Sequence, residues 1–291
     1  MGLKQNILIK INGKDLTVEP SSITYKDEAG TKSDSLTLEF AGEYLVPKYK
    51  DKISVVVDDF PFGMFVVQNT KLTKYTTTVE ATATDFNGTL KQKQNTSHST
   101  TTTKVIAQKI AKKHNLKCKC DVENNITHIS QINQSDLLFL SNLAKIHNAN
   151  FSIKNETLLF LKNNKKTFSK TIDANECEDY ELDISNKDDY KSCTAKYHDT
   201  KQNKVITITA GSGEPSYSIK REFKNKTEAK QQVEAMLNNK GKNKITGNLS
   251  IYGMPLEVGT KIELKGHVLT INTIEHTINE SGWNMQIELE S

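Results

Sequence analysis

The chain has 291 residues, 39 basic and 35 acidic side chains, a formal net charge of +4, and 35% hydrophobic residues. This length is sufficient for two or three domains with a substantial core. No apolar run approaches the roughly 18 residues of a membrane-spanning helix. No apolar signal segment precedes the first predicted strand. We therefore expect a protein that has no membrane anchor and is made and kept in a cytoplasm.

Residues 1–90 are predicted to form a small, tube-like β-barrel. Asn12-Gly13 is a strong hairpin signal between two short apolar runs. In the run 35–40, Leu36, Leu38 and Phe40 alternate with polar residues, as in a strand with one buried face. Five or six such runs separated by turns are typical of a barrel or sandwich.

Residues 91–165 are predicted to form an α+β insert lobe. The Ser/Thr-rich run 96–103 resembles a linker but also supplies N-cap residues. Helical spacing of apolar residues predicts a helix over about 103–115. A second helix follows Ser135, a good N-cap, and its two apolar stripes indicate that it lies between two partners. A hairpin over 151–161 completes the lobe.

Residues 166–291 are predicted to form a second β-barrel with an inserted helix at about 228–240. The runs 192–197 and 204–209 are predicted to form a hairpin, in which Cys193 is a small core residue. Three strands are predicted to close the chain, in the runs 255–266, 267–274 and 282–290. In the middle one, Leu269 and Ile271 lie on one face and Val268 on the other.

These last strands repeat an earlier pattern. Residues 51–57, 65–69 and 78–82 match residues 260–264, 268–272 and 286–290 in order and nearly in spacing, with Phe65 aligned to Val268. The pattern indicates two copies of one β-domain; chance similarity between two antiparallel meanders is the alternative. The predicted fold class is therefore mainly β with an α+β insert: two similar small β-barrel domains and an intervening α+β lobe.

Cys118 and Cys120 are flanked by His114 and His128. Although a metal site is conceivable there, no second Cys or His pair completes a tetrahedral set, so we predict no metal and no cofactor.

Three acidic clusters lie at 58–59, 176–179 and 188–189. Paired carboxylates can hydrolyse glycosides, but Asp is also common in turns at strand ends, and the turn interpretation is favoured. We predict no catalytic residue.

Three stretches resemble the phage late control protein D family, the baseplate hub proteins of contractile tails. The first is the leucine-rich segment 134–144 with the hairpin 149–160. The second is the helix 227–237 leading into 246–251. The third is Gly253-Met-Pro-Leu-Glu-Val-Gly259 with Ile274-Glu-His276 and the closing strand 282–289. Together they extend over most of residues 85–291.

The resemblance implies a structural, non-enzymatic homotrimer. Two barrels per chain would give a six-barrel ring that joins a hexameric tail tube protein to a trimeric spike protein. It also implies baseplate wedge proteins and a tape measure protein as partners, and a place in the tail baseplate of a virion or injection-system particle. We predict turn or anchor roles for Gly253, Pro255, Gly259 and Trp283. The alternatives are an OB-like nucleic-acid-binding protein and a peptidoglycan hydrolase.

Overall fold

The computed structural model describes residues 3–29, 33–43, 47–83, 90–147, 149–154, 156–162, 169–185, 190–199, 202–223, 226–240 and 245–291. The mainly β prediction is confirmed, and three helices accompany the strands. No helix in these ranges is long and apolar enough to cross a membrane.

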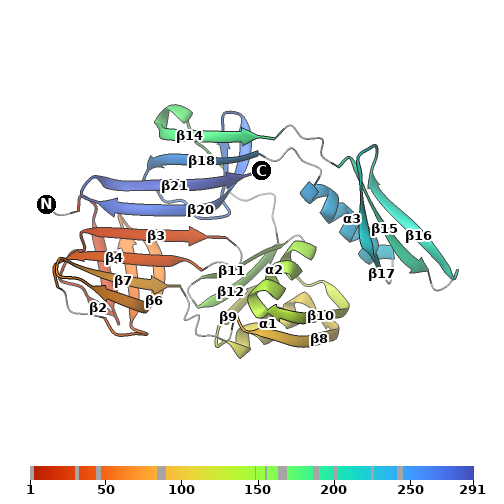
Figure 1. The fold of residues 1–291 in the computed structure, drawn as a ribbon, viewed down its shortest axis with the longest axis horizontal. Helices are drawn as coiled ribbons and strands as arrows, with labels where there is room; N and C mark the ends of the chain where they lie inside the picture. Colours follow the sequence, from red (N-terminus) through yellow and green to blue (C-terminus); the bar gives the residue numbers. More distant parts are fainter. Residues whose placement is uncertain are drawn as a thin grey trace.

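One thirteen-stranded sheet combines the first and last parts of the chain (Figure 1). We call residues 7–82 the N-terminal unit. Its strands are β1 (Ile7–Ile11), β2 (Lys14–Asp15), β3 (Ser22–Glu28), β4 (Ser35–Ala41), β5 (Lys52–Val57), β6 (Phe60–Leu72) and β7 (Thr76–Thr82). We call residues 169–184 and 245–290 the C-terminal unit. Its strands are β13 (Ser169–Thr171), β14 (Cys177–Ile184), β18 (Ile245–Tyr252), β19 (Lys261–Leu264), β20 (His267–Asn279) and β21 (Gly282–Glu290).

The two units join where β20 pairs antiparallel with β3. The strand order is β14-β18-β21-β20-β3-β4-β7-β6-β5-β1-β2, with β19 on β20 and β13 on β19. A single hydrophobic core extends through both units. Among the described residues the strand ladders form an open path and not a closed ring, so the prediction of two closed barrels is not confirmed.

The two units repeat one strand arrangement. In each, a short strand pairs with a thirteen-residue strand, β6 or β20, which then pairs with β7 or β21. In its ladder with β7 or β21, each long strand shifts register once, between Val67 and Asn69 in β6 and between Ile271 and Thr273 in β20. Since bulges are specific local features of a ladder, their identical placement supports a duplication.

The turn that enters each short strand is repeated as well. Lys50 donates its N–H to the Val67 carbonyl at 3.0 Å, and Gly259 donates to the Ile271 carbonyl at 2.9 Å. Both have a left-handed backbone, with φ of +73° at Lys50 and +87° at Gly259. Such a conformation costs a residue with a Cβ more than it costs glycine, so the C-terminal copy has the less strained version.

The structure corrects the predicted alignment of the middle strand by one residue. The bulge and the strand pairs make Phe65 equivalent to Leu269 and not to Val268. Phe65 and Leu269 are both buried, whereas Val268 is 59% exposed. A shift of one residue exchanges the two faces of a strand, which is why burial identifies the correct register.

The insert lobe has a separate core. Its elements are β8 (Lys93–Thr102), α1 (Thr103–Lys113), β9 (Lys117–Cys120), β10 (Asn125–Ser135), α2 (Asp136–Ile146), β11 (Ala149–Lys154) and β12 (Thr157–Lys162). The two predicted helices and the predicted hairpin are confirmed. The Ser/Thr-rich run is not a linker: most of it belongs to β8, which pairs with β10, and Thr102 then caps α1. Threonine favours strands because its branched Cβ suits an extended backbone.

Residues 192–240 form a third part with a small core of its own. It consists of β15 (Ser192–Asp199), β16 (Lys204–Gly211), β17 (Ser216–Phe223) and α3 (Lys226–Lys240). The predicted hairpin is β15–β16, and Cys193 is buried as predicted. These strands pair with one another and not with the large sheet, from which Figure 1 shows them set apart. The predicted domain boundaries at 90 and 165 stay predictions.

Candidate functional site

The predicted anchor residues surround the start of β21. Trp283 is buried, and its indole Nε1–H donates to His276 Nδ1 at 3.2 Å. Gly253 donates its N–H to the Trp283 carbonyl at 2.7 Å, and a Cβ at Gly253 would come within 2.0 Å of the indole ring. Gly253 is therefore required by close packing. Pro255 lies exposed at a bend, and Gly259 occupies the left-handed turn before β19.

Trp283 belongs to an aromatic cluster that fills the junction of the two units. Tyr25 of β3 stacks on Phe62 at 4.5 Å and on His276 at 5.2 Å between ring centroids. Phe60 lies 6.3 Å from Trp283. These rings come from β3 and β6 on one side and from β20 and β21 on the other. The cluster therefore packs the N-terminal unit against the C-terminal unit.

Above Tyr25, a buried aspartate joins all three neighbouring parts of the chain. Asp27 of β3 accepts from Lys154 Nζ of the insert lobe at 2.5 Å through Oδ1. It also accepts from the backbone N–H of Val258 in the C-terminal unit at 3.0 Å through Oδ2. The insert lobe and the C-terminal unit thus each bind one carboxylate oxygen of Asp27. We call this site the three-way junction.

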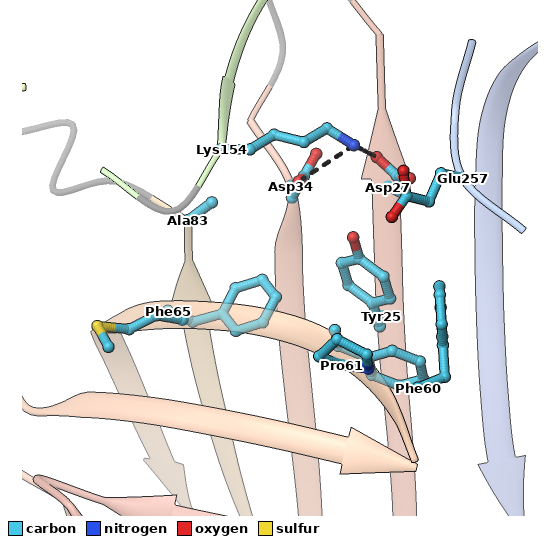
Figure 2. A pocket seen from close by; sticks show the side chains of 11 residues that line it. Tyr25, Asp27, Asp34, Phe60, Pro61, Phe65, Ala83, Lys154 and Glu257 are labelled. Atoms are coloured by element: carbon cyan, nitrogen blue, oxygen red, sulfur yellow. Dashed lines mark hydrogen bonds and ion pairs between the residues drawn. The ribbon is translucent and has the colours of Figure 1, made fainter. Parts of the chain in front are cut away.

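Asp34 and Glu257 complete the three-way junction, as Figure 2 shows. Lys154 Nζ lies 4.0 Å from Asp34 Oδ2, and Asp34 Oδ1 accepts from the Glu28 N–H at 3.0 Å. The side chains of Asp27 and Asp34 are 2% and 6% exposed. A small pocket of about 60 Å³ lies beside these carboxylates and has room for water.

Burial and charge shift the pKa values of these groups. Burial raises the pKa of Asp34 to about 7; Lys154 opposes this shift and Asp27 adds to it. Burial lowers the pKa of Lys154, but the carboxylates of Asp27 and Asp34 outweigh it, so the net shift is upward. Burial, and then the charge of Asp27, raises the pKa of the Tyr25 phenol far above its usual value. Lys154 is therefore held as a cation, and the junction is an ionic clamp.

His276 lies on the apolar side of the same site. Burial lowers its pKa to about 4, with Asp27 a weaker opposing influence. Because an indole N–H can only donate, Nδ1 must accept, and the neutral ring carries its proton on Nε2. Protonation of Nδ1 would remove the acceptor of the Trp283 bond.

Sequence reasoning missed Asp27, Asp34 and Lys154. Along β3, Ile23, Tyr25 and Asp27 all point inward and are buried. A charged residue at an inward position of an alternating strand requires a partner. The inward position of Asp27 in the alternating pattern was therefore the sequence signal that could have identified it. The partner could not be found in this way because Lys154 lies 127 residues further along the chain.

Asp136, the first residue of α2, is a buried acceptor inside the lobe. It accepts from His114 Nε2 at 2.7 Å, Gln131 at 2.9 Å and Lys113 at 2.9 Å. Burial raises its pKa, but these hydrogen bonds more than compensate and the net shift is downward. His114, considered above as a metal ligand, is thus bonded to a carboxylate. In the described part of the chain, no group of three or more His, Cys, Asp or Glu residues is placed to hold a metal ion.

The acidic clusters have ordinary positions in the chain. Asp58 and Asp59 form the turn between β5 and β6 with positive φ, as the turn interpretation predicted. The cluster 176–179 enters β14. The pair at 188–189 lies outside the described residues.

The chain is similar to two curated phage proteins, and no protein-family model matches it. It is 27% identical over 226 residues to the probable baseplate hub protein of Escherichia phage P2, over 69% of this chain and 58% of that protein. It is 32% identical over 137 residues to the probable baseplate hub protein of Escherichia phage 186, over 44% of this chain and 35% of that protein. The chain thus spans less than two thirds of the length of either relative. The predicted resemblance to phage baseplate hub proteins is confirmed.

Solved structures share the fold. A 43 kDa tail protein of prophage MuSo2 from Shewanella oneidensis superimposes with a TM-score of 0.72 and 14% identity, over 98% of each chain. A type VI secretion system component of E. coli superimposes with a TM-score of 0.56 and 12% identity, over 97% of this chain and 76% of that one. The fold is therefore shared with a prophage tail protein and with a component of a type VI secretion system.

Proposed function

We propose that this protein is a structural baseplate hub that assembles as a homotrimer and joins a hexameric tail tube to a trimeric spike. The observation that carries the proposal is the duplication within one sheet. Because each chain contains two equivalent units, an assembly of three chains contains six similar units. Such an assembly can present a pseudo-sixfold surface to a tube and a threefold surface to a spike.

The way in which the two units join also supports the proposal. The β3–β20 junction brings different surfaces of the two units together, so it is a heterologous contact. Heterologous contacts close into rings when the rotation between successive units allows it. In such a ring each unit would form one tube-like barrel, completed by its neighbours. The insert lobe, fixed by Lys154, would lie outside the ring.

Baseplate wedge proteins and a tape measure protein are further proposed partners, and the tail baseplate is the proposed location. The residues of the three-way junction act as a clamp in this account and not as an active site. We therefore propose a non-enzymatic role.

Co-purification of the full chain with candidate tail tube and spike proteins tests this function. The expected complex contains three hub chains for each spike trimer and binds one hexameric layer of tube protein. A chain that binds neither partner, but binds single-stranded DNA with an affinity that falls steeply with salt, would instead indicate a nucleic-acid-binding protein.

A further inference from the structure

We propose that the free edge of β14 pairs antiparallel with residues 69–72 of β6 in a second copy of this chain. We call residues 178–184 of β14 the acidic edge and residues 69–72 the basic edge. This inference rests on the proposed trimer and specifies the contact that closes it. The proposed contact is inferred from the β3–β20 contact that the chain already makes between its own two units.

Both edges are open in the described part of the chain. β14 pairs with β18 alone and lies at the outer margin of the sheet (Figure 1). β6 pairs with β5 only as far as Val66, so beyond the bulge its side facing away from β7 has no strand partner. Unpaired strand edges of this kind are ready to accept a strand from another chain.

The duplication assigns each open edge an equivalent in the internal junction. β6 is equivalent to β20, because their bulges and their partners correspond. β14 is equivalent to β3, because β3 pairs with β4, which pairs with β7, and β14 pairs with β18, which pairs with β21. Within the chain, β3 of one unit pairs with β20 of the other. The equivalent pairing is β14 of one copy with β6 of the next.

The register of the internal junction predicts the register of the proposed one. Lys26 lies opposite Glu275, and their charged groups are 3.5 Å apart. The equivalent of Lys26 is Asp183, and the equivalent of Glu275 is Lys71. The proposed pair, Asp183 and Lys71, therefore also has opposite charges, but its acidic and basic residues have exchanged strands relative to the internal pair. A pair of opposite sign directly across two strands stabilises their register.

The neighbouring position in this register is also compatible. Leu72, the last residue of β6, falls opposite Leu182. Leu72 is 53% exposed, whereas its internal equivalent His276 is fully buried. A partner strand would cover Leu72 with another apolar side chain.

The two edges also differ in charge over more than this one pair of residues. The acidic edge contains four carboxylates, at Glu178, Asp179, Glu181 and Asp183, whereas the basic edge contains Lys71, and Lys74 lies in the turn that follows it. Opposite charge favours the contact between unlike edges, and repulsion disfavours two acidic edges together. A second copy of this chain is the occupant that carries the complementary edge in the required register. Three copies joined in this way would have six equivalent junctions, three internal and three between chains.

Charge exchange at the predicted pair tests the inference. We would record native mass spectra of the full-length wild type, Lys71→Glu, Asp183→Lys and the double variant, with Lys204→Glu on exposed β16 as the control. Three chains of 32.7 kDa give a trimer of about 98 kDa. The expected result is loss of the trimer in each single variant, its return in the double variant and no change in the control. Circular dichroism melting curves would establish that every variant is folded.

Disulfide trapping tests the register separately. Directly opposed residues on antiparallel strands have Cα atoms about 4.5–5.5 Å apart, which suits a disulfide bond. After oxidation, the Lys71→Cys/Asp183→Cys double variant is expected to run as a covalent trimer on a non-reducing gel. Neither single cysteine variant is expected to form a covalent trimer.

The outcomes separate this inference from the proposed function. A wild-type trimer that persists in both charge variants and is not cross-linked would overturn the edge pairing while leaving the trimer intact. A wild type that stays monomeric at every concentration would overturn the trimer and the pairing together.

Discussion

Asn69 and Thr273 occupy the same position in the two units, and each binds a glutamate on the neighbouring strand. Asn69 Nδ2 lies 3.4 Å from Glu80 Oε2, and Thr273 Oγ1 lies 2.9 Å from Glu288 Oε2. Both donors directly follow the bulge of their strand. The duplication therefore extends from strand order to individual side-chain contacts, although the two donors are different residues.

The ionic clamp predicts an asymmetry between two lysines. Lys154→Met leaves the buried carboxylates of Asp27 and Asp34 without their cation, and we expect a loss of about 3 kcal/mol in the free energy of unfolding. Lys52→Met is the matched control, because Lys52 also links the N-terminal unit to the lobe, through an exposed pair with Glu156 at 2.8 Å. We expect less than about 1 kcal/mol for the control. Urea unfolding measures both values; equal losses would refute the clamp.

The contact between Gly253 and Trp283 predicts a strong steric effect. A Cβ at Gly253 meets the indole ring, so Gly253→Ala should cost about 3 kcal/mol or more through overpacking. Gly266→Ala has open space around its Cβ, so it measures only the strain of its positive φ, at about 1 kcal/mol. Adding Trp283→Leu to Gly253→Ala should recover part of the loss in a double-mutant cycle. Strict additivity would show that the two residues are not coupled.

His276 predicts a loss of stability in acid. Its pKa is lowered to about 4 in the folded protein, so the unfolded chain binds a proton first as the pH falls below 6.5. The contribution of neutral His276 is complete above pH 6.5 and decreases toward pH 4, by about 3 kcal/mol in total. His276→Gln should show a flatter dependence over this window, whatever its absolute stability. Parallel curves for the two proteins from pH 7 to pH 4 would contradict the prediction.

Asp136 predicts a second acid-sensitive step, located in the insert lobe. Its folded pKa is lowered, so its contribution is present above the unfolded pKa near 4 and is lost as the pH falls through the folded value. Asp136→Asn removes the carboxylate that Lys113 and His114 bind and should cost about 2 kcal/mol at neutral pH. Glu123→Gln, at an exposed ion pair, is the control with little expected effect. Hydrogen exchange of α1 and β10 amides would show whether the loss is confined to the lobe.

Local sequence patterns predicted much of the fold. Alternation identified most strands, and the buried stripes located all three helices. The repeated strand order was visible because its apolar pattern is local to each unit. The one-residue misalignment of Phe65 arose because a bulge shifts the pattern without leaving a sequence signal.

Long-range pairing could not be predicted in the same way. The contact of β3 with β20 joins residues about 250 positions apart, and nothing local in Thr24 or Thr277 indicates it. The separate sheet of β15–β17 was missed for the same reason, because alternation shows which face of a strand is buried but not against what. The candidate site depends on such contacts, so sequence reasoning did not identify Asp27, Asp34 and Lys154.

Imaging of the purified particle would reveal whether three chains present six equivalent units. We would determine its mass by native mass spectrometry and view it along its axis in averaged electron micrographs. We expect a particle of about 98 kDa, three times 32.7 kDa, with six similar lobes around a central opening. A stable dimer, or a trimer with three lobes and no pseudo-sixfold repeat, would contradict it.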